Sequence, residues 1–554
     1  MKKIFIILVI ILSLPTIWPL FHPGLFPMHD DTQVARVLTM GKALHDGMIP
    51  VRWVDYLGYN FGYPIFNFYG PFAYYIGGFI TFLGFSALTS TKIMMGLGMI
   101  TAGVSMYLLA QSIFGKKSGV LAAVFYMYAP YHASNLFVRG AIGELWAFAF
   151  LPLPFWGLWG LYKKGKFRYA VVTALTLAII ITAHNLTAMI IVPFILLLFI
   201  VLSIASWRRK EFKMFYLGGI SLVIGILLSA FYSIPALLEM QYTNVSSILG
   251  GGSNPIDHFV CVTQLWQSMW GYGGSAPGCV DGMSFMLGKI HIVFVLAGII
   301  STAYLLQKRL YKESFVLLSC FFVLVISLFM MLDTSKTLWQ SVSLLNYIQF
   351  PWRFLSLAVF SSSLIGGGVI SVLNKIKPRI ALLMTISVSL LCLLYYGKFF
   401  TPQYYQEDIK RYSDIQQITW NVSKISDEYL PKGIKKPVNS SQVSANLLSS
   451  ERGQITIQST DEKTQKKTIH LTSSDSQVRL NLAYFPAWQI KVDNKVINPT
   501  IASGHYIFPL RSGQHTITAT FIQTSTEFFS TILSLVGLSF LILGIIKTRI
   551  NKSL

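Results

Sequence analysis

The protein has 554 residues, of which 53% are hydrophobic and only 12% are charged, and its formal net charge is +22 at pH 7. With a mean hydropathy of +0.57, the chain is far more apolar than a soluble protein of its length, which predicts a polytopic membrane protein. The lysines and arginines stand in short clusters between apolar runs, where they set orientation in the bilayer. The basic charge therefore indicates membrane lipids as partners and implies no nucleic acid.

Apolar runs predict about twelve membrane-spanning helices. About 20 residues, and at least about 17, are needed to cross a hydrocarbon core of about 30 Å. The runs of this length are residues 4–20, 91–113, 118–134, 145–162, 168–184, 186–206, 214–235, 289–306, 313–332, 354–373, 379–397 and 526–546. The first run could be a signal peptide, but no small-x-small cleavage site precedes Phe21, which favours a retained helix.

The run 67–85, rich in aromatic residues, Gly and Pro, could be a further span or a segment lying in the membrane interface. If it does not cross, all the basic clusters fall on one side, which the positive-inside rule makes the cytoplasm. We therefore expect a multi-pass protein of the cell membrane with both termini in the cytoplasm. Four segments then lie outside, namely residues 21–90, 236–288, 333–353 and 398–525.

Residues 398–525 differ in character from the rest of the chain, because they are polar and carry short runs of alternating hydrophobicity. These runs are QITIQS, KTIHLT, QVRLNLA, WQIKVD, HYIFPL and HTITATFI. Period-two alternation bounded by turns predicts an antiparallel β-sandwich outside the membrane, with residues 400–440 as its linker and first strands. The expected organisation is a transmembrane domain over 1–397, a β domain over 398–525, and a last helix with a basic cytoplasmic tail over 526–554.

The first outer segment holds the strongest candidates for chemistry, the adjacent acids Asp30 and Asp31. Carboxylates are costly near lipid, so a pair of them where a helix leaves the membrane indicates a catalytic site. Alternatively, Asp30 caps the helix that begins near Thr32. The apolar pattern over 32–46, ended by Gly47, predicts an amphipathic helix, and a helix resting on the bilayer would explain that pattern as well.

Polar residues in other predicted outer turns each allow two interpretations. Arg139 and Glu144 could share the site of the acid pair or form a surface ion pair of little energetic value. His184 and Asn185 occupy a tight turn, where they could bind substrate or cap a helix. Arg353, at the mouth of a span, could hold a phosphate with its planar fork or anchor the helix among lipid headgroups.

Aromatic residues of the first segment, among them Trp53 and Tyr63, are candidates for binding a sugar ring together with the carboxylates, and Arg52 is a further candidate for a phosphate. Cys261 and Cys279 lie in one outer segment, where they either form a disulfide worth about 3 kcal/mol or stay reduced. No metal-ligand spacing or nucleotide motif appears. No cofactor is predicted, although a divalent metal at the acid pair stays possible.

The runs HDDTQVARVLTMGKALHDGMIPVRW, GYPIFNFYGPFAYY, RGAIGELWAFAFLPL, ITAHNLTA and QFPWRFL resemble membrane proteins labelled 6-pyruvoyl-tetrahydropterin synthase-related domain. In layout that group is similar to the GT-C superfamily of integral membrane glycosyltransferases. The C-terminal run YFPAWQIKVDNKVINP looks like that of YfhO-like proteins. Activity of the pterin enzyme itself is not expected, because no histidine triad in a metal-ligand context is present.

The GT-C resemblance implies an outward-facing site, a polyprenyl-phosphate-linked sugar donor, and a glycan, lipid or protein acceptor. It also implies a general base in the first outer loop, where Asp30 or Asp31 stands, and a second acid in the next loop, where Glu144 stands. No donor-binding motif of the superfamily matches residues 236–288, which leaves the donor sugar open. The expected function is an inverting glycosyltransferase. The alternative is a transporter or flippase of lipid-linked sugars or cell-envelope polymer. Repeated halves would favour this alternative, and the sequence shows no such repeat.

Overall fold

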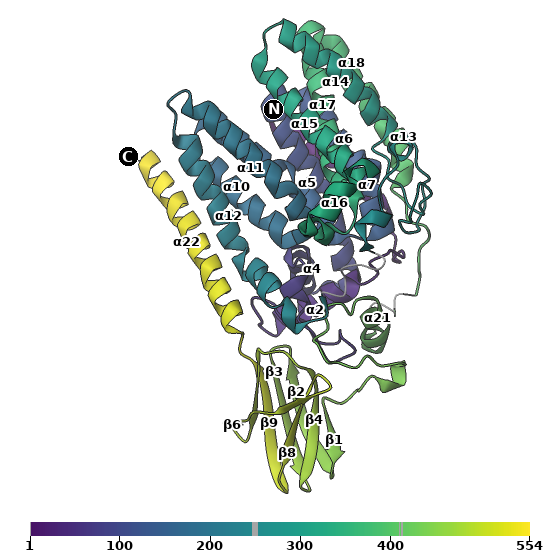
Figure 1. The fold of residues 1–554 in the computed structure, drawn as a ribbon, viewed down its shortest axis with the longest axis vertical. Helices are drawn as coiled ribbons and strands as arrows, with labels where there is room; N and C mark the ends of the chain where they lie inside the picture. Colours follow the sequence, from purple (N-terminus) through teal and green to yellow (C-terminus); the bar gives the residue numbers. More distant parts are fainter. Residues whose placement is uncertain (1, 246–252, 409, 411–413, 554) are drawn as a thin grey trace.

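The structure is a computed structural model that describes residues 2–245, 253–408, 410 and 414–553. A bundle of helices makes up most of the molecule, and two antiparallel sheets stand at one end of it (Figure 1). Ten helical stretches within the described residues are long and apolar enough to cross a membrane: Lys3–Phe21, Ala87–Phe114, Ile142–Lys164, Asn185–Trp207, Lys213–Leu238, Lys289–Gln307, Tyr311–Met331, Pro351–Ile376, Pro378–Phe399 and Ser525–Thr548. The protein is therefore a multi-pass membrane protein.

The individual helices follow these stretches closely. The helices that make up most of these stretches are α1 (Lys2–Ile17), α5 (Ala87–Phe114), α8 (Ile142–Phe150), α9 (Pro152–Lys164), α11 (Asn185–Trp207), α12 (Lys213–Leu238), α14 (Lys289–Gln307), α15 (Tyr311–Met331), α17 (Leu355–Ile376), α18 (Pro378–Tyr396) and α22 (Ser525–Ser553). Shorter helices stand at the ends of these helices and between them: η1 (Trp18–Phe21), α3 (Ile65–Phe68), η3 (Met240–Tyr242), η6 (Pro255–Asp257), α13 (Val262–Trp266), η7 (Asp333–Ser335), α16 (Lys336–Ser341), η8 (Ser343–Ile348), η9 (Pro351–Phe354), η10 (Gly397–Phe399) and η12 (Ser440–Gln442).

Of two further predicted spans, one forms a shorter helix than predicted and the other keeps its predicted length. The run 118–134 forms α6 (Lys116–Tyr128), and the run 168–184 forms α10 (Phe167–Ala183), of 13 and 17 residues. Helix α6 ends at Tyr128, because the next residue, Ala129, precedes a proline and is driven out of the helical region. Pro130 then begins α7 (Pro130–Ala133), which leads into the π-helical turn η2 (Ser134–Arg139). Ten stretches of the described residues are long and apolar enough to cross a membrane, and α10, with 17 residues, lies at the lower limit of about 17.

The first outer segment, residues 21–90, contains two helices, α2 (Gln33–His45) and α4 (Phe72–Phe82), that pack against each other. Helix α2 confirms the predicted amphipathic helix and is followed by Gly47 at φ +87°. Helix α4 has 11 residues, about 16 Å, too short to cross a bilayer alone. A Cβ on Gly78 of α4 would lie 2.4 Å from Met40 Cγ of α2, so the two helices touch. Since most of α2 is buried, it does not rest on the bilayer, and that alternative is wrong.

The C-terminal strands form two antiparallel sheets with the orders β1-β4-β8-β7 and β2-β3-β9-β5-β6. Their bounds are β1 (Leu448–Arg452), β2 (Ile455–Lys463), β3 (Lys466–Ser473), β4 (Ser476–Ala483), β5 (Trp488–Val492), β6 (Lys495–Val496), β7 (Thr500–Ala502), β8 (His505–Leu510) and β9 (Gly513–Phe521). All six alternating runs became strands. Leu480 of the first sheet and Ile469 and Ile517 of the second are buried in one core, because every second residue of a strand points to the same face.

Residues 400–440 were expected to contain the first strands, and this is wrong for their described part. It holds the short helices α20 (Ile415–Gln417), η11 (Ile418–Val422) and α21 (Ser423–Ile425), and the first strand begins at Leu448. Pro431 and Pro437 interrupt any ladder here, because proline donates no hydrogen bond. The segment runs instead as a linker along the first outer segment, and α22 packs back along α12 (Figure 1).

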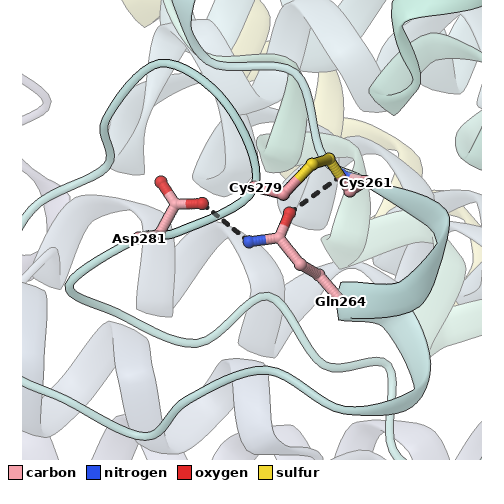
Figure 2. Close-up of a disulfide and its surroundings, with 4 residues drawn as sticks. All are labelled: Cys261, Gln264, Cys279 and Asp281. Carbon is pink, nitrogen blue, oxygen red and sulfur yellow. Dashed lines mark hydrogen bonds between the residues drawn. A yellow bond between two sulfur atoms is a disulfide. The ribbon is translucent and has the colours of Figure 1, made fainter.

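A disulfide joins Cys261 to Cys279, so the bridged alternative is the correct one (Figure 2). The closed loop is held from inside by Gln264, whose Oε1 accepts from the Cys261 backbone N–H (2.8 Å) and whose Nε2 donates to Asp281 Oδ2 (2.7 Å). Asp281 Oδ1 also accepts from the Ala276 N–H at 2.8 Å. These contacts give the loop a defined shape. Residues 246–252 of the same outer segment lie outside the described part.

Candidate functional site

All four predicted outer segments meet at one cavity of about 850 Å³. Its lining residues include His29, Asp30, Phe68, Tyr69, Arg139, Glu144, His184, Asn185, Met240, His258, Ser275, Tyr347, Gln349, Phe350, Trp352, Arg353, Glu428, Tyr429 and Lys432. Segments far apart in the sequence thus form a single site, which includes six of the ten predicted site residues. The disulfide-closed loop contributes through Ser275, whose hydroxyl lies 2.9 Å from His258 Nδ1.

The first outer segment is hydrogen-bonded directly to the turn that carries Arg139. The backbone N–H of His29 donates to Val138 O (3.0 Å), and that of Asp30 donates to Arg139 O (2.9 Å). The side chain of Gln33 donates to Gly140 O at 2.8 Å. Gly140 has φ +63°, a conformation that glycine adopts without strain. This turn holds the backbone of Asp30 against that of Arg139, and both residues line the cavity.

The structure separates the two adjacent acids. Asp30 is exposed and lines the cavity, whereas Asp31 is 7% exposed and is absent from the lining residues. Asp30 is not the N-cap of α2, because the N-cap residue is Thr32, whose side chain makes no capping hydrogen bond. The capping alternative is therefore wrong, and Asp30 is the acid of the pair that can touch a ligand in the cavity.

Glu144 lines the cavity and lies between two arginines. Its Oε2 is 2.9 Å from Arg139 Nη2 and 3.7 Å from Arg353 Nε. Its Oε1 accepts a hydrogen bond from the hydroxyl of Tyr131. The three charged side chains are only 9%, 1% and 8% exposed, for Arg139, Glu144 and Arg353. The predicted pairing of Arg139 with Glu144 is correct, but the pair is buried, so the reading as a surface ion pair is wrong.

The two arginines are held in place by further contacts. The Arg139 guanidinium lies 4.4 Å from the ring centroid of Trp352. Arg353 Nη1 donates to Ile348 O (2.7 Å) and to Gln349 Oε1 (3.1 Å). Burial alone would lower the pKa of Arg139, but the charge of Glu144 and, more weakly, that of Asp30 raise it. A buried arginine that faces a cavity is not an anchor in the headgroups, so that alternative for Arg353 is wrong.

His184 and Asn185 form the tight turn between α10 and α11. The His184 Nδ1 accepts from the Thr187 backbone N–H at 3.2 Å, which makes it the N-cap of α11. Its ring also lines the cavity, so the capping role is confirmed without excluding contact with a ligand. A Cβ on Gly70 would lie 2.1 Å from Ala183 O. Glycine there allows the first outer segment to pack against this turn.

Arg52, Trp53 and Tyr63, predicted to bind substrate, do not line the cavity. Arg52 donates to Thr531 Oγ1 of α22 at 3.0 Å. Trp53 is completely buried and packs edge-on against Trp488 of β5 at 5.5 Å between centroids. Tyr63 donates to the backbone O of residue 426 in the linker at 3.1 Å. They hold the C-terminal part of the chain against the first outer segment.

The sequence analysis missed the residues that the linker brings to the cavity, Glu428, Tyr429 and Lys432. Burial raises the pKa of Glu428, and the charge of Asp30 adds to this effect, while Arg36 opposes it. The run DEYL, with acids next to an aromatic residue in an outer segment, was the available signal. Among the described residues, no group of three or more His, Cys, Asp or Glu side chains could hold a metal ion.

Residues 66–399 match the model of the family described as 6-pyruvoyl-tetrahydropterin synthase related domain, a membrane protein. The chain belongs to this family. An uncharacterized protein of Lactococcus lactis subsp. cremoris is 28% identical over 253 residues, which make up 44% of this chain and 41% of that relative. The match to the family agrees with the resemblance seen in the sequence.

Among solved structures, the chain is similar to the oligosaccharyltransferase of Archaeoglobus fulgidus. For its apo form the TM-score is 0.46, with 14% identity over 79% of this chain and 60% of that one. For the same archaeal protein, AglB, in complex with an inhibitory peptide and a dolichol-phosphate, the TM-score is 0.43, with 14% identity over 76% and 59%. The chain thus spans about 60% of this archaeal protein and 41% of the Lactococcus relative.

Proposed function

We propose that the protein is an integral membrane glycosyltransferase that moves a sugar from a polyprenyl-phosphate-linked donor to an acceptor hydroxyl outside the cytoplasm. The observation that carries this proposal is that the exposed acid Asp30 and two buried arginines, Arg139 and Arg353, line one large cavity. A carboxylate can accept a proton, and arginines can hold a phosphate bidentately. The positive-inside rule supports a position of the outer segments, and with them the cavity, outside the cytoplasm.

In the proposed reaction, the acceptor oxygen attacks the anomeric carbon of the donor sugar and its proton passes to Asp30. The bond between that carbon and the phosphate oxygen breaks, and polyprenyl phosphate leaves with the bonding electrons. Direct displacement inverts the anomeric configuration. A general base of this kind contributes about 10²- to 10⁴-fold to the rate.

The arginines have the second role, because they can neutralise the charge that develops on the leaving phosphate. Arg353 and Arg139 line the cavity. Glu144 is held by both arginines and by Tyr131, so its carboxylate is already engaged. We assign Glu144 to positioning the arginines rather than to proton transfer.

The test compares Asp30→Asn with Asp31→Asn in full-length protein reconstituted into liposomes with a radiolabelled polyprenyl-phosphate sugar and membrane extract as acceptor source. Asp30→Asn is expected to lower transfer by about 10²-fold or more, and Asp31→Asn to lower it much less, because Asp31 does not line the cavity. Equal losses in both variants would contradict the assignment of the base. Movement of intact labelled donor across the bilayer, without transfer, would favour a transporter.

A further inference from the structure

The segment that precedes the β domain forms part of the cavity wall. The Arg36 Nη2 of α2 donates to the Ser426 hydroxyl at 2.8 Å. On the other side, the backbone N–H of Asn244 donates to Leu430 O (3.1 Å), and that of Lys432 donates to Tyr242 O (3.0 Å). Residues 426–432 are thus wedged between the first outer segment and the residues that follow α12. This wedge directs three side chains into the cavity, those of Glu428, Tyr429 and Lys432.

The wall at this end combines aromatic faces with carboxylates. The rings of Phe68 and Tyr429 are parallel within 4°, with centroids 6.0 Å apart, and Tyr69 meets Tyr429 at 75°. The Glu428 Oε1 lies 4.0 Å from Arg36 Nη2 and accepts from the Ser426 hydroxyl at 3.3 Å. These partners keep the charged carboxylate at the edge of the aromatic wall.

Asp30 lines the same cavity as this wall and as the two arginines. Its backbone is bonded to Arg139. Burial raises the pKa of Tyr69 well above its ordinary value, and the negative charge of Asp30 adds to the rise. The charge of Asp30 therefore acts on the Tyr69 hydroxyl and on the Arg139 guanidinium. A hydroxyl bound against Tyr69 and Tyr429 would lie next to the proposed base, while a phosphate held by the arginines would lie beyond it.

We propose that Glu428, Tyr429, Phe68 and Tyr69 form an acceptor subsite for a saccharide, so that the acceptor of the reaction is a glycan. This inference rests on the proposed glycosyl transfer. A pyranose offers an apolar face of C–H groups that packs on an aromatic ring, and hydroxyls around its edge that donate to carboxylates. The alternation of aromatic faces with two acids, Glu428 and Asp30, matches this pattern. An aliphatic lipid acceptor offers no ring of hydroxyls that could donate to these two carboxylates.

The test measures binding without the donor, so that it does not depend on turnover. Full-length protein in nanodiscs is examined by saturation-transfer NMR with cellobiose, maltose, lactose and N,N′-diacetylchitobiose as probes. At least one disaccharide is expected to receive saturation on one ring face. Loss of an aromatic platform in Tyr429→Ala should weaken this binding about tenfold, Tyr429→Phe should restore it, and Glu428→Gln should weaken it as well.

Two matched controls lie outside the cavity. Tyr404 is 53% exposed, and Glu451 of β1 is paired with Arg479 at the surface, so Tyr404→Ala and Glu451→Gln should bind the disaccharide as the wild type does. The proposal is overturned if none of the four disaccharides binds, or if Tyr429→Ala binds them as tightly as the wild type.

The experiments distinguish failure of the proposed glycosyl transfer from failure of the saccharide subsite. If a disaccharide binds through Tyr429 but the reconstituted protein transfers no sugar to any acceptor, the saccharide subsite stands and the transferase proposal is wrong. If instead the wild type glycosylates a peptide or lipid at a rate that Tyr429→Ala leaves unchanged, glycosyl transfer stands and the saccharide subsite is wrong.

Discussion

Removal of the negative charge of Glu144 should destabilise the protein strongly. In Glu144→Gln the two guanidiniums lose their common anion, the carboxylate 2.9 Å from Arg139 Nη2 and 3.7 Å from Arg353 Nε. Breaking a buried pair by neutralising one partner costs about 3–5 kcal/mol, because a buried charge is left uncompensated. Here both arginines keep neutral acceptors, Asn135 Oδ1 and Ile348 O, so we expect a cost near the lower end, about 3 kcal/mol.

This loss can be measured as the midpoint of thermal unfolding in detergent, followed by intrinsic fluorescence. A cost of about 3 kcal/mol should lower the midpoint by roughly 2–3 °C in a chain of 554 residues, because the entropy of unfolding grows with chain length. Glu451→Gln, which opens an exposed ion pair with Arg479, is the matched control and should change it by less than about 1 °C, because such pairs contribute little.

A double-mutant cycle tests the physical cause. Arg353→Gln removes one of the two charges that Glu144→Gln leaves without a partner, so the double variant should be more stable than the sum of the single losses predicts. The expected interaction free energy is about 1–2 kcal/mol, in the range found for groups in contact. Strict additivity, or a Glu144→Gln protein that unfolds at the wild-type temperature, would refute the coupling of the three charges.

Three further predictions follow from the structure. Arg353→Lys keeps the charge but loses the planar fork, so transfer activity should fall by about tenfold or more, whereas the surface control Arg479→Lys should remain active. A fully active Arg353→Lys would remove the phosphate role. Replacing both Cys261 and Cys279 by Ser opens a loop with a sequence separation of 18 and should cost about 3 kcal/mol, and an unchanged midpoint under reducing and oxidising conditions would contradict this. Burial and the charge of Glu527 raise the pKa of Glu239 to about 7 from 4.5, so the folded state binds this proton more tightly and its stability should fall as pH rises from about 4.5 to about 7; Glu239→Gln should flatten this part of the stability profile, and an unaltered profile would count against it.

Local patterns in the sequence were enough to predict most elements. Apolar runs gave ten of the predicted spans, because the length of hydrocarbon to be crossed is the same for every helix. Alternating runs gave six strands, because the side-chain period of a strand is set by its own backbone. Where a proline stood inside a run, as at Pro130, the local pattern overestimated the helix.

The identity of the acid in the cavity required the tertiary structure. Asp30 and Asp31 are neighbours of the same type, and no local pattern distinguishes them. Two backbone hydrogen bonds, from His29 to Val138 and from Asp30 to Arg139, decide which carboxylate faces the cavity. The same holds for Arg353, whose burial against Glu144 depends on the packing of η9 onto a turn more than 200 residues earlier.

The roles of the aromatic residues also depended on contacts between distant segments. Trp53 and Tyr429 are both aromatic residues of outer segments, yet the first is completely buried against Trp488 and the second lines the cavity. Composition determines that such side chains will leave water, because the free energy gained by burying an apolar side chain depends on the area that it buries. Which surface covers each of them, another domain or a ligand cavity, is decided only by the way the linker folds back onto the first outer segment.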